Sequence, residues 1–286
     1  MIPSTFDYLA ASSVDEAVQA LSEAGEDGKV LAGGQSLVPV LRLRLAMPTK
    51  LVDLNKISEL RGVRDDGDAI VVGAMTTHHD VINDPLIREY AALLSLATQT
   101  VGDPQIRHRG TLGGALVHAD PAGDLLAPAV ALDAEMVIVG PGGRRTVAAA
   151  EFFVDLFTTV VGPDELLVEV RIPKKAGWGA HYEKFQRVAQ AWSIVAVAAT
   201  VRAEGGSIAE ARVALTNMAA TPVRATGVEQ ALVGQPATVQ TICAAAEHAA
   251  ENTSPTSDGN ADADYREHLA RVLTARALTA AAGVAS

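Results

Sequence analysis

Two glycine-rich segments constrain the fold of this chain more than any other feature of its sequence. One is Ala32-Gly33-Gly34-Gln35-Ser36 and the other is Gly110-Thr111-Leu112-Gly113-Gly114. Paired glycines allow positive φ and let the backbone approach a bulky anion closely. Successive N–H groups can then point into one concavity that suits phosphate. Together the segments predict a shared site for the two phosphates of a dinucleotide; taken singly, each could be an ordinary tight turn.

The spacing of these glycines excludes the two commonest phosphate-binding loops. Neither segment fits the G-x-G-x-x-G fingerprint of Rossmann folds or the P-loop pattern. The first lies between a predicted strand at residues 29–32 and a predicted helix at 37–45, whose N-terminus would favour an anion. A further strand is predicted at 50–54. Strand, turn, helix and strand indicate a small parallel unit with a right-handed crossover.

The whole sequence predicts an α+β (mixed α/β) fold in three domains, spanning residues 1–54, 55–173 and 178–286. Ser13-Val14-Asp15-Glu16 is a capping box that begins a helix in the first domain. The central domain is predicted to be mostly antiparallel, and the third to combine a sheet with helices. Further strands are predicted at 60–64, 69–73, 135–139, 166–172, 193–202 and 208–216, helices at 77–83, 86–100 and 125–132, an irregular stretch at 102–114, and Ala-rich helices beyond residue 224.

Charge and cysteine content restrict the partners. The net charge of −11 argues against nucleic acid, which requires a basic surface. Cys243 is the single cysteine, so the chain can form no intrachain disulfide, and we expect it to be a small buried apolar residue. No targeting segment or membrane span is expected. A cytoplasmic location follows as an expectation, with any membrane association going through a partner.

The two glycine segments and their surroundings resemble the flavin subunits of molybdenum hydroxylases. AGGQS is followed by a Leu/Arg-rich helix and LVDLN, and the second segment lies in VGDPQIRHRGTLGGALVHADPAGDLLAPAVALDAE. The resemblance continues through DELLVEVRIP and HYEKFQRVAQAWSIVAVA to VALTNMAATPVRA, so it covers essentially the whole chain. Within that family the pattern is most similar to the medium subunits of aerobic carbon monoxide dehydrogenases.

The resemblance implies one non-covalent FAD per chain, with the two glycine loops clasping its pyrophosphate. It implies no metal and no catalytic residue on this chain. A Cβ branch at Gly33 or Gly113 would fill the space of a phosphate oxygen and oppose positive φ, so valine there should abolish FAD binding. The implied cofactor-binding residues are Ala32, Gly33, Gly34, Gln35, Ser36, Leu37, Val101, Thr111, Gly113, Gly114, Asp124, Leu167 and Lys184.

Three of the implied roles have open alternatives. Asp124 would accept a hydrogen bond from a ribose hydroxyl, so Asp124→Ala should weaken FAD binding less than the glycine variants do, or it would cap the following helix. Lys184 would meet the electron-rich edge of the flavin ring or be a solvated surface lysine. Trp192 would pack near the ring or be a core tryptophan. The seven histidines are expected on the surface or in loops, with His118 nearest the flavin.

The implied function is electron transfer from iron–sulfur clusters on a partner, through FAD, to an external acceptor such as a quinone. The implied partners are an iron–sulfur small subunit and a molybdenum large subunit, in a dimer of heterotrimers. Carbon monoxide dehydrogenase is the favoured activity. The alternatives are the flavin subunit of a xanthine or aromatic-heterocycle dehydrogenase, a self-contained flavin enzyme of another family, and an interaction subunit without cofactor.

Overall fold

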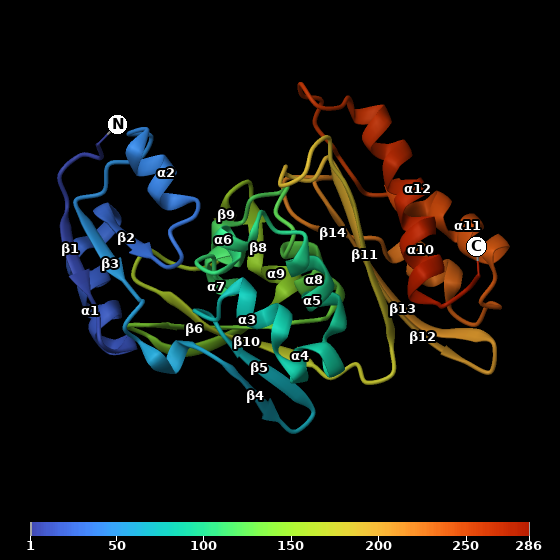
Figure 1. Ribbon diagram of the computed structural model, residues 1–286, viewed down its shortest axis with the longest axis horizontal. Helices are drawn as coiled ribbons and strands as arrows, with labels where there is room; N and C mark the ends of the chain where they lie inside the picture. The colour runs from blue at the N-terminus through green and yellow to red at the C-terminus, as the bar shows by residue number, and fades with distance from the viewer. Residues whose placement is uncertain (1, 286) are drawn as a thin grey trace.

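A small parallel sheet forms the N-terminal part of the chain (Figure 1). The computed structural model describes residues 2–285. Strands β1 (Asp7–Ala10), β3 (Lys50–Asp53) and β2 (Gly28–Leu31) lie in this order and pair in parallel. Helix α1 (Val14–Ala24) begins at the predicted cap, where Ser13 accepts a hydrogen bond from the Glu16 N–H, and the turn η1 (Gly25–Asp27) follows it. The predicted parallel pair is confirmed, and β1 joins it as a third strand.

The first glycine segment connects this sheet to helix α2 (Leu37–Arg42). The helix is shorter than the predicted 37–45, because Leu43 is its C-cap and Arg44 adopts a positive φ of 57°. A left-handed residue cannot continue a right-handed helix. The chain therefore turns back after fewer than two helical turns and enters β3.

The central part is built on an antiparallel five-stranded sheet, as the sequence predicts. Its order is β4 (Val63–Asp66), β5 (Ala69–Gly73), β10 (Leu166–Pro173), β6 (Glu135–Gly140) and β7 (Gly143–Ala148). Its other elements are the turn η2 (Ser58–Leu60), helices α3 (His78–Asn83), α4 (Pro85–Tyr90), α5 (Ala92–Gln99), α6 (Pro104–Arg107), α7 (Leu112–His118), α8 (Leu126–Ala131) and α9 (Ala149–Phe152), and the short pair β8 (Phe153–Asp155) and β9 (Thr158–Thr159).

Two predictions for the central helices were wrong in detail. The single helix predicted at 86–100 is two helices, because Ala91 between them has φ −139°. The first of them begins at Pro85 with Asp84 as its cap, an arrangement that proline favours. The stretch 102–114, predicted as irregular, contains α6 and the start of α7.

The C-terminal part is a four-stranded antiparallel sheet covered on both faces. Strands β11 (Gly179–Phe185), β12 (Val195–Glu204), β13 (Ser207–Thr216) and β14 (Val223–Arg224) lie in chain order. Helices α5 and α8 of the central part contact β12, while α12 (Ala263–Ala281) packs against β11 and β12. Because the sheet is covered on both faces, residues 195–201 are buried without a break, and all of them except Thr200 are apolar rather than alternating with polar residues.

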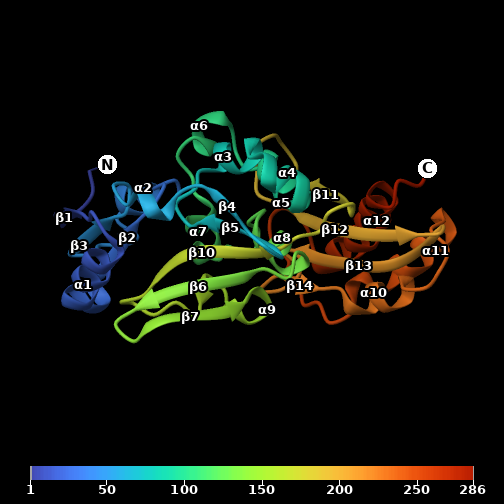
Figure 2. The same ribbon diagram turned by 90° about the horizontal axis from the view of Figure 1, so that it is seen from below.

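The remaining C-terminal elements are α10 (Thr226–Leu232), α11 (Val239–Ala246) and η3 (Glu247–Ala250). Together with α12 they lie at the end of the molecule opposite the N-terminal sheet (Figure 2). The prediction of a mixed α/β chain with a C-terminal sheet and helices is confirmed. Strand β11, which the sequence analysis did not assign, packs against α5 of the central part, as β12 and β13 pack against α8.

A cluster of charges ties the central and C-terminal parts together. Asp133 accepts hydrogen bonds from Lys175 at 3.2 Å, Arg212 at 3.1 Å and Arg224 at 2.5 Å. Burial alone would raise the pKa of the Asp133 carboxyl, but Arg224 and Lys175 outweigh it and hold that pKa below its ordinary value. This carboxylate therefore stays charged and fixes the sheets relative to each other.

Candidate functional site

A cavity of about 740 Å³ lies where the three parts meet. This is an ordinary size for a cofactor site. Both glycine segments line it, with side chains from the central sheet and from β11 completing the wall. All thirteen residues predicted to bind the cofactor lie on this wall: Ala32, Gly33, Gly34, Gln35, Ser36, Leu37, Val101, Thr111, Gly113, Gly114, Asp124, Leu167 and Lys184. The fold thus gathers residues that lie as many as 152 positions apart, from 32 to 184.

The first glycine segment presents a run of free backbone donors to this cavity. None of the N–H groups from Gly33 to Leu37 donates a hydrogen bond to an acceptor within residues 2–285, and Ser36 gives α2 no side-chain cap. Gly34 has φ +75°, a conformation that favours glycine and turns successive N–H groups toward one point. Such a donor set fits the oxygens of a phosphate or pyrophosphate.

The second glycine segment is different, because the structure uses most of its donors internally. The N–H groups of Leu112, Gly113 and Gly114 donate to Thr76 O, Ala74 O and the Thr111 hydroxyl oxygen, at 3.0, 2.8 and 3.2 Å. The Thr111 hydroxyl keeps its own proton to donate. The two segments predicted to share the phosphates are therefore unequal: the first leaves the N–H groups of Gly33 to Leu37 without an acceptor in the described residues, and the second leaves only the N–H and the hydroxyl of Thr111.

The predicted reason for Gly33 and Gly113 was also wrong. Neither residue has positive φ. A Cβ on Gly33 would meet the backbone of the second segment, at Arg109 O and, 2.7 Å away, at Gly110 Cα. A Cβ on Gly113 would lie 2.6 Å from Ala74 Cβ. Gly33 is needed because its backbone packs against the backbone beside Gly110, and Gly113 is needed because the second segment packs against Ala74. Both contacts shape the cavity.

Asp124 is buried and fully engaged by side chains. One carboxylate oxygen, Oδ1, accepts from the Tyr182 hydroxyl at 2.8 Å and the Ser193 hydroxyl at 2.9 Å, and Oδ2 accepts from Lys184 Nζ at 2.8 Å. The helix-cap alternative is wrong, since α8 has Leu125 as its N-cap and no side-chain cap bond. The contact between Asp124 and a ribose hydroxyl stays a prediction. That hydroxyl would have to donate to a carboxylate lone pair that the three side-chain donors leave free.

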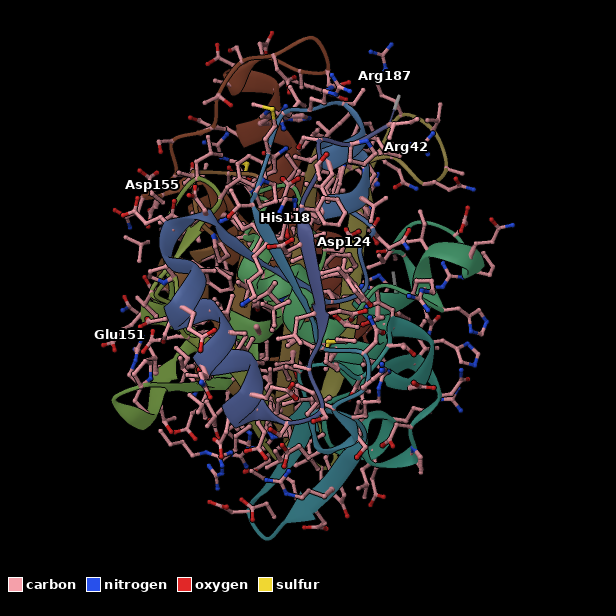
Figure 3. The ribbon with its side chains drawn as sticks, turned by 90° about the vertical axis from the view of Figure 1, so that its left-hand side faces the viewer. Arg42, His118, Asp124, Glu151, Asp155 and Arg187 are labelled. Carbon is pink, nitrogen blue, oxygen red and sulfur yellow. The ribbon has the colours of Figure 1, made fainter. Side chains whose placement is uncertain are left out.

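The structure excludes one of the two alternatives for Lys184 and one of the two for Trp192. The Lys184 side chain is 5% exposed, so it is no solvated surface lysine. Trp192 is 58% exposed and lines the cavity, so it is no core tryptophan. Contact of each residue with the flavin ring stays a prediction. Both residues lie on the cavity wall. Figure 3 shows Asp124 and His118 near the middle of the molecule, with Arg187 and Asp155 toward its edge.

The histidines only partly follow expectation. His118 lines the cavity, with its ring 5.2 Å from that of Phe157, and His79 stacks on His108 at 4.0 Å. His78 contradicts the prediction of a surface or loop position, because it is 3% exposed and lines the same cavity. Its ring packs where a Cβ on Gly110 would be. Thr77 caps α3, and the T-x-x-D pattern that begins there is a signal that could have placed His78 at the first position of a helix.

The ionisation of His78 predicts how stability depends on pH. Burial, and to a smaller extent Arg107, lowers the pKa of His78 to about 4 from 6.5. Between these values the unfolded chain binds a proton that the folded chain does not, so stability falls as the pH drops. The full loss is about 3 kcal/mol, at 1.36 kcal/mol for each pKa unit. Urea unfolding from pH 7 to pH 4 measures it.

Two substitutions check this assignment. His78→Phe and His78→Gln differ in packing but share the loss of the titrating ring. Both should therefore lose the same one-proton slope between pH 6.5 and pH 4, whatever their stability at pH 7. An unchanged slope in both variants would mean that the imidazole is protonated in the folded chain.

Other cavity residues were missed by the sequence analysis. Most come from short connecting segments and the rest from α6, α7 and the start of β10, and their approach depends on the three-dimensional packing. On the cavity wall they are Leu54, Ala74, Met75, Ile106, Ala115, Val117, Asp120, Phe157, Val161, Leu166, Gln190 and Ala191. Most are apolar, which suits the burial of a flat aromatic ring system.

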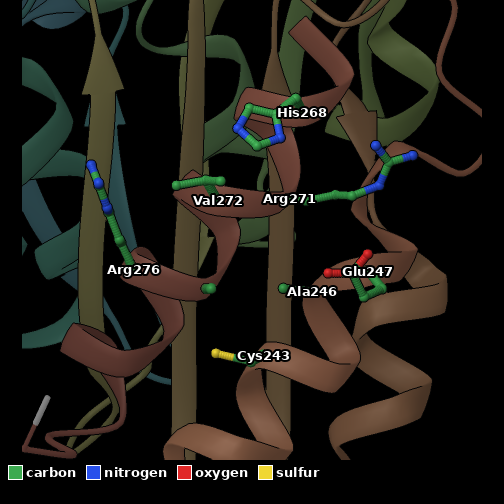
Figure 4. Close-up of a pocket in the computed structure, with 8 residues that line it drawn as sticks. Cys243, Ala246, Glu247, His268, Arg271, Val272 and Arg276 are labelled. Atoms are coloured by element: carbon green, nitrogen blue, oxygen red, sulfur yellow. The ribbon is translucent and has the colours of Figure 1, made fainter. Parts of the chain in front are cut away.

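A second pocket, of about 670 Å³, lies between α11 and α12 (Figure 4). Cys243, Glu247, His268, Arg271 and Arg276 are among the residues that line it. Cys243 is exposed, which corrects the prediction of a buried residue. None of the residues implied by the glycine segments reaches this pocket. Within residues 2–285, no helix combines the length and apolarity needed to cross a bilayer, and no three His, Cys, Asp or Glu side chains are grouped to hold a metal ion.

Comparison with known proteins gives the same assignment over the whole chain. Residues 4–175 match the family described as the FAD binding domain in molybdopterin dehydrogenase, and residues 180–281 match the CO dehydrogenase flavoprotein C-terminal domain. The carbon monoxide dehydrogenase medium chain of Hydrogenophaga pseudoflava is 42% identical, with 98% of each chain covered.

Two solved structures are similar throughout. A carbon monoxide dehydrogenase from Hydrogenophaga pseudoflava has a chain with a TM-score of 0.96 and 42% identity, and all of both chains is covered. Quinoline 2-oxidoreductase from Pseudomonas putida 86 has one with a TM-score of 0.94 and 34% identity, with 99% of each covered. The chain therefore belongs to the family of FAD-binding subunits of molybdopterin dehydrogenases, and its cofactor is FAD.

Proposed function

We propose that this chain is the FAD-binding electron-transfer subunit of a carbon monoxide dehydrogenase. It would pass electrons from iron–sulfur clusters on a small subunit, through FAD, to an external acceptor such as a quinone. The observation that carries the proposal is the single cavity that joins the free N–H groups of Gly33 to Leu37 with the buried ammonium of Lys184. The 42% identity to a carbon monoxide dehydrogenase medium chain supports the choice of complex.

The residues of the chain would bind and orient the cofactor. The N–H groups of Gly33 to Leu37 and the Thr111 hydroxyl would donate to the pyrophosphate. Val101 and Leu167 would provide apolar walls, and the remaining residues of the predicted set would complete the site. When bound, FAD supplies the ability to accept and release one or two electrons, while the protein provides position and electrostatics.

The edge of the cavity supports docking of a partner. Trp192 and Phe157 line the cavity and are 58% and 51% exposed. Leu45 and Met47, next to the cavity residue Ala46, are 75% and 65% exposed. Large apolar side chains that gather around a site mark an interaction surface.

We propose that an iron–sulfur subunit covers this edge and that a molybdenum subunit completes the complex, in a dimer of heterotrimers. The cytoplasmic location and membrane association through a partner stay predictions.

The test compares the chain in its complex with the chain alone. Under anaerobic carbon monoxide, the flavin absorbance near 450 nm should bleach in the complex and not in the FAD-loaded chain separated from its partners. Reduction of the lone chain at the rate of the complex would contradict the proposal and favour a self-contained flavin enzyme. A complex that purifies without flavin would favour the cofactor-free alternative.

The similarity to quinoline 2-oxidoreductase favours a second candidate, a dehydrogenase for aromatic heterocycles. The cavity of this chain does not distinguish the two, since in the proposal the substrate is oxidised on the molybdenum subunit. Supplying carbon monoxide, quinoline and xanthine in turn to the same anaerobic complex separates them. Flavin bleaching by a heterocycle alone would replace carbon monoxide as the assigned substrate.

A further inference from the structure

A buried ion pair lies on the wall of the cavity. Lys184 Nζ is 2.8 Å from Asp124 Oδ2, and the two side chains are 5% and 4% exposed. Lys184 comes from β11, whereas Asp124 precedes α8 of the central part. The other lysine on the cavity wall, Lys29, is exposed. Lys184 is therefore the buried ammonium that this cavity offers among its described residues.

Two hydroxyl groups support the carboxylate of this pair. Tyr182 lies two residues before Lys184 on β11, so both side chains point to the same face of the strand. Ser193 lies just before β12, next to Trp192. Both hydroxyls donate to Asp124 Oδ1, at 2.8 and 2.9 Å, and both residues are buried. The Tyr182 pKa is raised well above its ordinary value, first by burial and then by Asp124, so its hydroxyl keeps the proton that it donates.

The ammonium of Lys184 has a hydrogen to spare. It donates to Asp124 Oδ2 and, at 3.3 Å, to the carbonyl oxygen of Thr100. An ammonium group carries three hydrogens. No third acceptor is found for it within residues 2–285, and Lys184 is part of the cavity wall. The remaining hydrogen is thus available to a bound cofactor.

We infer that Tyr182 and Ser193 are positioning residues that keep Asp124 ionised, hold Lys184 in place against bound FAD, and thereby set the reduction potential of the flavin. The inference rests on the proposed function for the presence of the flavin ring at Lys184. It assigns to Asp124 the role of anchoring a cation, and it brings in two residues that the sequence analysis did not single out.

The electrostatics explain why the hydroxyls matter. Burial raises the pKa of the Asp124 carboxyl above its ordinary value, while Lys184, Tyr182 and Ser193 oppose that rise. Without the two hydroxyls, only Lys184 opposes the effect of burial on the Asp124 pKa. The pKa therefore rises further, and the carboxyl takes up a proton at a higher pH. The pair then changes from neutral to a net charge of +1. A net positive charge favours the reduced flavin, which carries more negative charge.

Other titratable groups face the same cavity. His118 and Asp120 follow the second glycine segment, His78 comes from α3, and Glu26, Lys29 and Glu165 lie on the remaining wall. None of them donates a hydrogen bond to Asp124 or Lys184. Their contribution to the pH profile of the flavin should therefore be the same in the variants as in the unmodified chain.

The experiment measures the midpoint potential of FAD in the assembled complex, by equilibration with reference dyes from pH 6 to pH 9. The double variant Tyr182→Phe/Ser193→Ala should show a more positive potential at low pH and a new inflection in its pH profile. Lys184→Gln removes the positive charge, so it should shift the potential to more negative values, and its Asp124 inflection should lie at a higher pH than in the double variant, because Lys184 opposes the rise of the Asp124 pKa more than the hydroxyls do. Tyr265→Phe is the matched control, since Tyr265 is exposed on α12 and makes no contact with the pair.

Further variants separate a positioning role from a merely structural one. Ser193→Thr keeps a hydroxyl and should restore the unmodified pH profile, while Ser193→Ala alone should show a smaller shift than the double variant. If the double variant does not fold, these single variants carry the test. A potential and pH profile equal to those of the unmodified complex, at full FAD occupancy, would overturn the inference. Failure of carbon monoxide to reduce a flavin-loaded complex would instead contradict the proposed substrate and leave the potentials measurable.

Discussion

Gly33→Val is expected to remove FAD from the site and to weaken the fold around it. The new Cβ would collide with the backbone of Arg109 and with Gly110 Cα at 2.7 Å, and backbone atoms cannot move aside as a flexible side chain would. Overpacking of this kind costs about 1–3 kcal/mol of stability. Displacing the segment also misplaces its donors. Losing two hydrogen bonds to a charged phosphate, at about 1.5 kcal/mol each, lowers the affinity for FAD by a factor of about 100 or more.

Flavin content of the purified complex and urea unfolding measure the two effects. Gly142→Ala is the control, because Gly142 has no positive φ and nothing lies within 4 Å of a Cβ placed there. It should keep both FAD and stability. Gly34→Ala should lose less FAD and less stability than Gly33→Val but more than Gly142→Ala. A φ of +75° strains alanine, while its Cβ would meet only side-chain atoms, 3.1 and 3.3 Å away. Full flavin occupancy in Gly33→Val would show that the contact between the two segments does not shape the site.

The sequence was sufficient to locate this site because its strongest signals are local. The glycine segments, the Ser13 cap and the strands that flank Gly33 depend on neighbours within a few residues. It was not sufficient to assign the roles of the glycines. The Gly113 N–H could donate to a ligand or to Ala74 O. Which of the two it does depends on a contact between residues 74 and 113, which are 39 positions apart, and no local pattern encodes that contact.

The same limit explains the errors at single residues. The stretch His181-Tyr182-Glu183-Lys184 is polar throughout and ends in two charged side chains, so Lys184 could be taken for a surface residue. Its burial depends on Asp124, which is 60 positions away. Cys243 lies in an Ala-rich helix that has one side open to the second pocket, and its exposure follows from which side of α11 meets α12. Composition does not determine that orientation.

Asp124→Asn is expected to be among the most destabilising conservative substitutions in the chain, an effect on stability that a ribose contact alone does not predict. The amide keeps the size of the side chain but leaves the Lys184 ammonium buried without a counter-charge. Breaking a buried ion pair in this way costs about 3–5 kcal/mol. Unfolding in urea at pH 7 measures the loss.

A double-mutant cycle separates the charge from the packing. Lys184→Met keeps the aliphatic length and leaves Asp124 as an unpaired buried acid. Asp124→Leu alone leaves the Lys184 ammonium unpaired, and the two substitutions together remove both charges. Replacing a whole buried pair by apolar residues is often close to neutral, so the double variant should be more stable than either single variant. The coupling energy should be about 2–3 kcal/mol, at the upper end for residues in contact. Additive losses with no coupling would mean that water reaches the pair and screens it. In that case the Lys184 ammonium would be hydrated, and the cavity wall would present no water-excluded charge to a cofactor.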